Sequence, residues 1–168
     1  MFRLDAKAGG SEERVSHTNL GEVYSDSTRV IHAQAELSTE PDVMVAFSET
    51  FQRGRVRYVP GSRDPDLTPA LEGSPDLVVE AVSFSSVHKD TEVLRRLYAR
   101  AGIPEYWLAD GRVGLHHFQI LALQEGEYVA VPPDSDGWTP SPRLGLQFRL
   151  VRHRTPHGSW RYILEYQD

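Results

Sequence analysis

The chain has 168 residues, of which 39% are hydrophobic and 25% are charged, so its composition is that of a folded protein and excludes a disordered or collagen-like chain. This length suits one domain with a substantial core. The formal net charge of −6 at pH 7 argues against tight non-specific wrapping of nucleic acid. Local basic stripes remain open, because residues 141–168 hold five arginines against two acids.

The sequence contains no cysteine. Disulfides, thiolate nucleophiles and sulfur-ligated metal sites are therefore excluded, and a metal would have to lie among oxygen or imidazole ligands. No run approaches the ~18 to 20 apolar residues of a membrane helix, and the first residues lack the apolar core of a signal peptide. We predict a cytoplasmic protein without a membrane segment.

Residues 1–20 mix glycine, serine and charge without periodicity, which predicts a flexible leader before one domain over residues 21–168. The β-branched and aromatic content of residues 23–31 and 41–47 predicts a strand in each. Residues 48–74 predict a long loop, with at most a short strand around Val56–Val59.

The middle of the chain predicts a strand, a helix and a second strand. The near-continuous apolar run Pro75–Val82 is typical of a strand covered on both faces. Apolar residues at helical spacing follow, with Asp90 or Thr91 as the expected cap and Gly102 as the stop. Glu105–Asp110 reads as a strand, and the short crossover implies that it pairs in parallel with the first.

The carboxyl-terminal third predicts further β-structure. Residues 113–123 and 128–131 indicate a hairpin. A proline-bearing loop over residues 132–142 follows, and residues 144–151 and 160–166 indicate two more strands.

Glu80 interrupts the apolar strand with a carboxylate, and burial of an unpaired carboxylate costs several kcal/mol, so Glu80 needs a partner. An arginine that makes it purely structural is as good a reading as a metal ion. Asp42 heads the other short apolar strand, where an acid after a proline often serves only the turn. If the two strands are neighbours, the two acids could form an oxygen-rich site for Mg²⁺ or Mn²⁺ that activates water at a phosphate.

A positive group would complete such a site. Lys89, at the turn into the helix, is the only lysine of the predicted domain and could reach back, although an exposed structural lysine is an equal reading. Three arginines alternate on the possible strand of the long loop, at Arg53, Arg55 and Arg57. They could face a phosphate backbone, but a solvated edge is favoured.

Other residues favour structural roles. His116 and His117 would point to opposite faces of a strand, which disfavours a joint metal site. Tyr98, Tyr106 and Trp107 fall at core periodicities, which favours packing over base stacking.

The segments Pro41–Val45, Ser74–Ser83 and Tyr98–Asp110, in this order and spacing, resemble the Uma2 endonuclease family. The resemblance implies the α/β restriction-endonuclease-like fold of the PD-(D/E)xK nucleases, with a mixed sheet and flanking helices. It implies that Asp42 and Glu80 bind a divalent metal, Mg²⁺ or Mn²⁺, and that Asp76 assists them.

The chain departs from the family pattern at the lysine positions, which hold Val82 and Leu94. Lys89 would be a migrated lysine, with Arg95 and Arg96 as weaker candidates because arginine is a poor proton carrier. The leader also looks too short for the helix and strand with which the family usually begins, so the protein is either a truncated relative or is completed by another chain, for example in a homodimer.

The resulting prediction is a metal-dependent endonuclease that acts on DNA or another nucleic acid, with Asp42, Glu80 and Lys89 as catalytic residues. The alternative is a catalytically degenerate nuclease fold that serves as a binding or assembly module. A hydrolase for another phosphate ester is a third reading.

Overall fold

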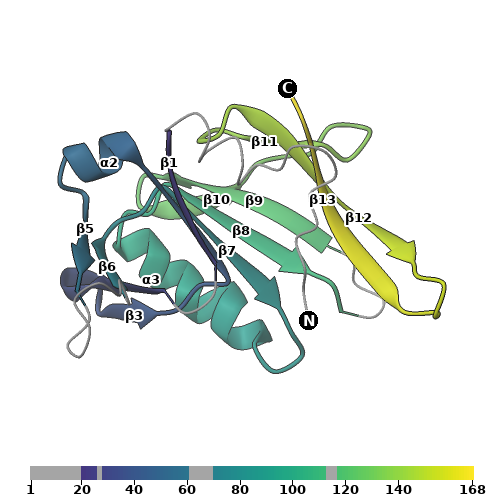
Figure 1. Cartoon of the computed structure of the whole chain (residues 1–168), viewed down its shortest axis with the longest axis horizontal. Coiled ribbons are helices and arrows are strands. Elements are labelled where there is room, and N and C mark those ends of the chain that lie inside the picture. The colour runs from purple at the N-terminus through teal and green to yellow at the C-terminus, as the bar shows by residue number, and fades with distance from the viewer. Residues whose placement is uncertain (1–19, 26–27, 61–69, 113–116) are drawn as a thin grey trace.

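A mixed β-sheet forms the centre of the computed structural model, which describes residues 20–25, 28–60, 70–112 and 117–168 (Figure 1). Within these ranges the sheet has six strands in the order β1-β4-β7-β8-β9-β10. Their bounds are β1 Gly21–Ser25, β4 Val43–Phe47, β7 Leu77–Val82, β8 Glu105–Asp110, β9 His117–Gln124 and β10 Glu127–Ala130. Only β7 and β8 pair in parallel among these strands, as the short crossover between them predicts.

Two smaller sheets flank the central one. The first has the order β3-β2-β6-β5 and the second the order β11-β12-β13. Their bounds are β2 Arg29–His32, β3 Leu37–Thr39, β5 Val56–Val59, β6 Ala70–Gly73, β11 Thr139–Ser141, β12 Leu146–Arg154 and β13 Trp160–Gln167. Two short helices, η1 Ala33–Ala35 and α2 Ser48–Gln52, connect strands in the first half of the chain.

A longer helix lies between β7 and β8 and packs on the central sheet (Figure 1). It contains a π-helical segment, η2 Lys89–Leu94, which continues into α3 Arg95–Arg100. The predicted stop is confirmed, because Gly102 follows with a φ of +69°, a conformation that glycine adopts readily. The predicted cap is wrong: the Asp90 N–H already donates to Ser86 O within the helix, and Asp90 is buried.

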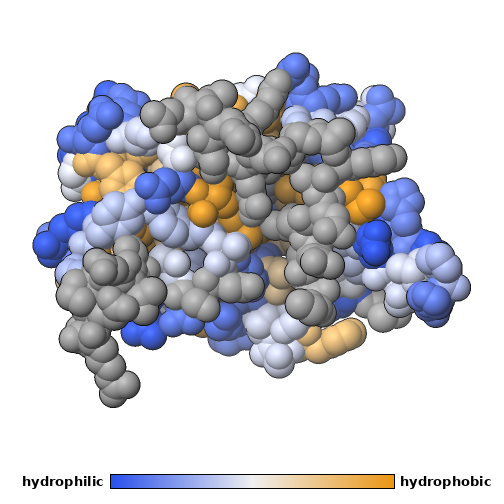
Figure 2. Space-filling model, viewed as in Figure 1, coloured by the Kyte–Doolittle hydropathy of each residue, from blue (hydrophilic) through white to orange (hydrophobic). Residues whose placement is uncertain are grey.

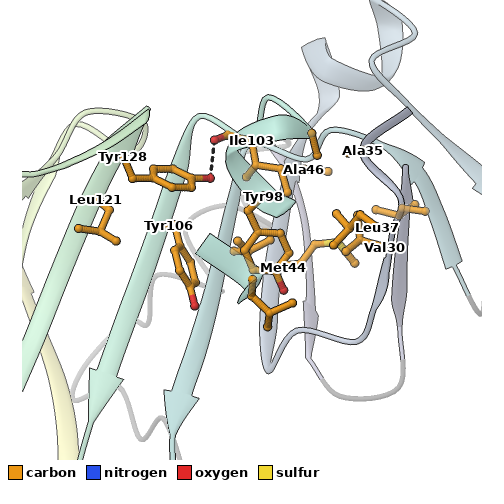
Figure 3. Close-up of a cluster of buried hydrophobic side chains, with 14 of the residues drawn as sticks. Val30, Ala35, Leu37, Met44, Ala46, Tyr98, Ile103, Tyr106, Leu121 and Tyr128 are labelled. Atoms are coloured by element: carbon orange, nitrogen blue, oxygen red, sulfur yellow. Dashed lines mark hydrogen bonds between the residues drawn. The ribbon is translucent and has the colours of Figure 1, made fainter. Parts of the chain in front are cut away.

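Each face of the central sheet carries a hydrophobic core. On one face, Val78, Tyr98 and Tyr106 pack with residues of the four-stranded sheet such as Leu71. Figure 3 shows the Tyr98, Tyr106 and Tyr128 rings in this core, with the hydrogen bond from Tyr128 Oη–H to Ile103 O (2.7 Å).

The second core lies on the other face of the central sheet. Val79, Trp107 and Ile120 pack there against Phe148 of the three-stranded sheet. β7 is therefore covered on both faces, as its apolar run predicts.

Several predicted boundaries are wrong. The stretch predicted as one strand over residues 23–31 contains parts of β1 and β2, which belong to different sheets, and the predicted loop over residues 48–74 contains α2 and β6 besides the expected short strand β5. The loop over residues 132–142 contains β11. The predicted leader lies outside the described residues up to residue 19, as does His116.

Candidate active site

Asp42 and Glu80 come together through the pairing of β4 with β7. Val43 lies opposite Val79 in this antiparallel pair, so Asp42, one residue before β4, continues the register toward Glu80. The Asp42 carboxylate is exposed, and its Oδ2 accepts a hydrogen bond of 2.6 Å from the Ala81 N–H. The sheet thus places the Asp42 carboxylate directly beside the residue that follows Glu80.

Glu80 is almost fully buried, with 3% of its surface exposed. Its Oε1 accepts a hydrogen bond of 2.7 Å from the Tyr98 hydroxyl, which reaches it from α3. Burial raises the pKa of Glu80 to about 7, and the charges of Asp42 and Asp90 act in the same direction. The Tyr98 hydrogen bond and the Lys89 charge oppose this rise without cancelling it.

Lys89 lies at the same group of acids. Its Nζ is 3.3 Å from Asp90 Oδ1. Desolvation alone would lower the pKa of Lys89, but the charges of Glu80, Asp90 and Asp42 outweigh it and raise the pKa. The Lys89 side chain is half exposed, so its ammonium group faces both the acids and the solvent.

Asp90 is a member of this group that the sequence analysis assigned only to a helix cap. Its side chain is 1% exposed, and within the described part of the chain its Oδ1 has no hydrogen-bond partner besides the ion-pair contact with Lys89. Helical spacing could have revealed this position, because Asp90 precedes the buried Leu94 by four residues and so shares its face. The acid group around Glu80 therefore holds one more carboxylate than expected.

Asp76 is held at the other end of β7, where its carboxylate has a full set of partners. Oδ2 accepts from the Phe47 N–H (2.8 Å) and from the Thr50 hydroxyl (2.6 Å), and Oδ1 forms an ion pair with Arg143. The carboxylate is 0% exposed. The structure thus ties Asp76 to α2 and to the segment before β12, and does not bring it to Asp42 and Glu80.

The positions at which the family pattern has lysine are apolar and buried. Val82 is 7% exposed and Leu94 is 4% exposed, and both belong to the core beneath the helix. Arg95 donates to Tyr128 O (2.6 Å), and Arg96 is exposed. Among the described residues, Lys89 is the cation whose charge lowers the pKa of Glu80, and its ion pair is with the neighbouring Asp90.

The donor set at this site consists of carboxylate oxygens, which suit a hard divalent cation. No group of three or more His, Asp or Glu side chains is arranged to hold a metal anywhere in the described ranges. Mg²⁺, however, is commonly bound by one or two carboxylates together with water and substrate phosphates. Asp42 and Glu80 supply two carboxylates, the number that this mode of binding uses.

The arginines that the sequence analysis considered for phosphate binding include two that form ion pairs with acids of the same chain. Arg53 pairs with Glu49 and Arg57 with Glu72, at 2.5 Å each, on exposed surface. These pairs agree with the favoured reading of a solvated edge.

The aromatic residues expected in the core, Tyr98, Tyr106 and Trp107, are buried. His117 is exposed, and no described helix is long and apolar enough to cross a membrane.

The mixed sheet with its covering helix matches the restriction-endonuclease-like fold. A solved structure described as a "putative nuclease belonging to DUF820", from Anabaena variabilis, matches with a TM-score of 0.54 and 17% sequence identity. The match covers 78% of this chain and 65% of that one, so the chain spans less than two thirds of the matched protein.

The chain belongs to the Uma2 family, described as "Putative restriction endonuclease", whose model matches residues 11–153. The resemblance that the sequence motifs carry is thereby confirmed. No curated protein matches the sequence.

Proposed function

We propose that this protein hydrolyses phosphodiester bonds of nucleic acid with Mg²⁺ or Mn²⁺ held by Asp42 and Glu80. The observation that carries the proposal is the Asp42 carboxylate fixed on the Ala81 N–H beside the buried Glu80. A protein rarely buries a carboxyl with a pKa of about 7 next to two further acids unless the arrangement has a use. Family membership supports a nucleic-acid substrate.

When bound, the divalent cation supplies a Lewis acid for the phosphoryl group and lowers the pKa of water. The residues of this chain orient the two carboxylates. Tyr98 fixes one oxygen of Glu80, and the Ala81 N–H fixes one oxygen of Asp42. The Lys89 ammonium group, 3.3 Å from Asp90 Oδ1, would orient the attacking water and stabilise negative charge on the phosphate.

Cleavage of supercoiled and single-stranded DNA in Mg²⁺ and in Mn²⁺ tests the proposal. We expect Asp42→Ala, Glu80→Ala and Lys89→Met each to reduce the rate by about 100-fold or more, because each removes a group at the reacting phosphate. The matched control is Glu49→Ala, which removes an exposed acid from α2. Cleavage that survives both acid substitutions would refute the assignment.

The alternative function is a binding or assembly module that keeps the nuclease fold without catalysis. The apolar Val82 and Leu94 at the family's lysine positions favour it. Mn²⁺ titration by calorimetry separates the two functions. A catalytic site binds Mn²⁺ in the wild type and loses binding in Asp42→Ala, whereas an inactive fold shows no binding that depends on these acids.

A further inference from the structure

The distal half of the β12–β13 hairpin, residues 151–164, carries an unusual concentration of positive charge. It contains Arg152, Arg154 and Arg161 together with His153 and His157, and it contains no acid. The whole chain has a formal net charge of −6, so this segment is a local exception to the charge of the molecule. We call residues 151–164 the basic tip.

Two of these arginines are held on one tryptophan. Arg154 lies opposite Trp160 in the register of the hairpin, and Arg152 lies opposite Tyr162. The guanidinium carbons of Arg152 and Arg154 are each 4.5 Å from the centroid of the Trp160 ring, within the range of a cation–π contact. Trp160 therefore contacts two positive groups at the surface.

The arginines of the basic tip keep their charge available. Most other arginines of the described ranges pair with an acid. Within the same ranges no ion pair joins Arg152, Arg154 or Arg161 to a carboxylate. Pre-positioned guanidinium groups without an internal counter-ion are suited to bind phosphate.

The basic tip is anchored to the end of β8. The Tyr162 hydroxyl donates to Gly111 O at 2.6 Å. A Cβ atom on Gly111 would lie 3.1 Å from the Tyr162 ring, which shows how closely the hairpin approaches the chain here. Gly111 follows Asp110, which lies opposite Val82, two residues beyond Glu80.

This anchorage puts the basic tip at the end of the central sheet where β7 and β8 finish, on the face opposite the one into which Glu80 points, so a nucleic-acid strand joining the two runs around the end of the sheet. Figure 1 shows the hairpin projecting on the side toward which β7 and β8 point, and Figure 2 shows mainly hydrophilic surface over the hairpin at the right of the view.

We propose that the basic tip binds the phosphate backbone of the nucleic acid whose scissile bond lies at Asp42 and Glu80. The inference rests on the proposed function for the identity of the substrate. Arg152 and Arg154, which contact Trp160, bind phosphates of that backbone away from the scissile bond. The contact is with the backbone, so it carries no base sequence information.

The test is the binding of a labelled DNA duplex of about 30 base pairs, and of a single strand of the same length, in EDTA so that no cleavage occurs. The variant Arg152→Ala/Arg154→Ala is compared with Arg29→Ala/Arg53→Ala, which removes the same charge from exposed ion pairs elsewhere. We expect the basic-tip variant to raise Kd about 10-fold at low salt and to reduce the slope of log Kd against log salt by about 1.8. The control changes Kd by less than about 2-fold.

Trp160→Ala provides a second variant, because it leaves the charge intact and removes only the support of the two guanidinium groups. We expect it to raise Kd about 3-fold with an unchanged salt slope. Thermal melting followed by circular dichroism confirms that each variant folds. The preference between duplex and single strand identifies which form of backbone the basic tip binds.

The outcomes separate this inference from the proposed function. Equal Kd values and salt slopes for the basic-tip variant and its control overturn the inference, while cleavage that depends on Glu80 still upholds the nuclease. DNA binding that depends on the basic tip without any cleavage supports the inference and favours the binding module. A wild-type protein that neither binds nor cleaves DNA overturns both.

Discussion

Glu80 is a carboxyl group close to two other acids and a tyrosine hydroxyl, and its pKa of about 7 lies well above the ordinary glutamate value of 4.5. A raised pKa in the folded state means that the folded protein holds the Glu80 proton more tightly than the unfolded chain does. The stabilisation is complete below the unfolded pKa and is lost as the pH rises through about 7. The shifted pKa of Glu80 contributes up to about 3 kcal/mol to the free energy of unfolding.

The metal-free protein should therefore lose stability between pH 5 and pH 8, and Glu80→Gln should remove part of this loss. We expect the Tm of Glu80→Gln in EDTA to exceed that of the wild type at pH 8 but not at pH 5. The pKa of Glu105 is also raised by burial, so the informative quantity is the difference between the variant and the wild type.

The matched control for this prediction is Glu127→Gln, at an exposed acid of β10, whose Tm should follow the wild type at both pH values. Divalent metal should restore the stability of the wild type at pH 8, because only the charged form of Glu80 binds a cation. Identical pH profiles for Glu80→Gln and the wild type would contradict the raised pKa.

Single residues show what the sequence can and cannot predict. The carboxylate of Glu80 stands out because it interrupts an apolar run, and burial follows from that pattern. Asp90 escapes notice because an acid near a helix start fits a cap equally well, and only the helical register reveals that it faces inward. The partners of Asp76 come from segments distant in the sequence, so no local pattern predicts them.

At the level of elements, the ion pair between Asp76 and Arg143 joins β7 to the segment before β12. Arg143→Met would leave a fully buried carboxylate without its counter-ion, at a cost of about 3 kcal/mol. We expect a correspondingly lower urea midpoint, with unchanged Mn²⁺ affinity of the folded protein. If Arg143→Met lowered the Mn²⁺ affinity without lowering the stability, Asp76 would have to be counted among the metal ligands.

Arg149→Met is the appropriate control for that experiment. It breaks an ion pair with Glu165 that is about one third exposed at both partners, and such pairs contribute at most about 1 kcal/mol. The two substitutions have the same chemistry, so a difference in urea midpoint measures the burial of the partner acid.

The elements around the site could be predicted because they are apolar and locally regular. β5 and β8 have the predicted bounds, and the parallel pairing of β7 with β8 follows from the short crossover. Residues 23–31 have the composition of one strand, yet the chain leaves one sheet after β1 and enters another at β2. Composition records the tendency to form strands but not which sheet each strand joins.

For the whole molecule, the two cores share the central sheet, which predicts that the described sheets unfold together. Leu71→Ala, in the core that contains the four-stranded sheet, should cost about 2 to 5 kcal/mol. The fluorescence of Trp107, in the opposite core, should report the same shift of the urea midpoint as circular dichroism. This result would also support the single domain predicted for residues 21–168.

Val129→Ala provides the control, because this β10 side chain is 46% exposed and its truncation should cost less than about 0.5 kcal/mol. A fluorescence transition that stays in place while the circular dichroism transition moves would indicate two independently folding parts. Trp138 and Trp160 also fluoresce, so the comparison uses the blue-shifted signal of the buried Trp107.

The hydrogen bond from the Ala81 N–H to Asp42 lies just beyond the last backbone pair of β4 with β7. Asp42 Oδ2 accepts this hydrogen bond in place of a backbone carbonyl of the neighbouring strand, so formation of the sheet orients the carboxylate. The entropy of aligning this ligand is lost during folding rather than when an ion arrives. At the proposed metal site, Asp42 would therefore bind a cation with little loss of side-chain freedom.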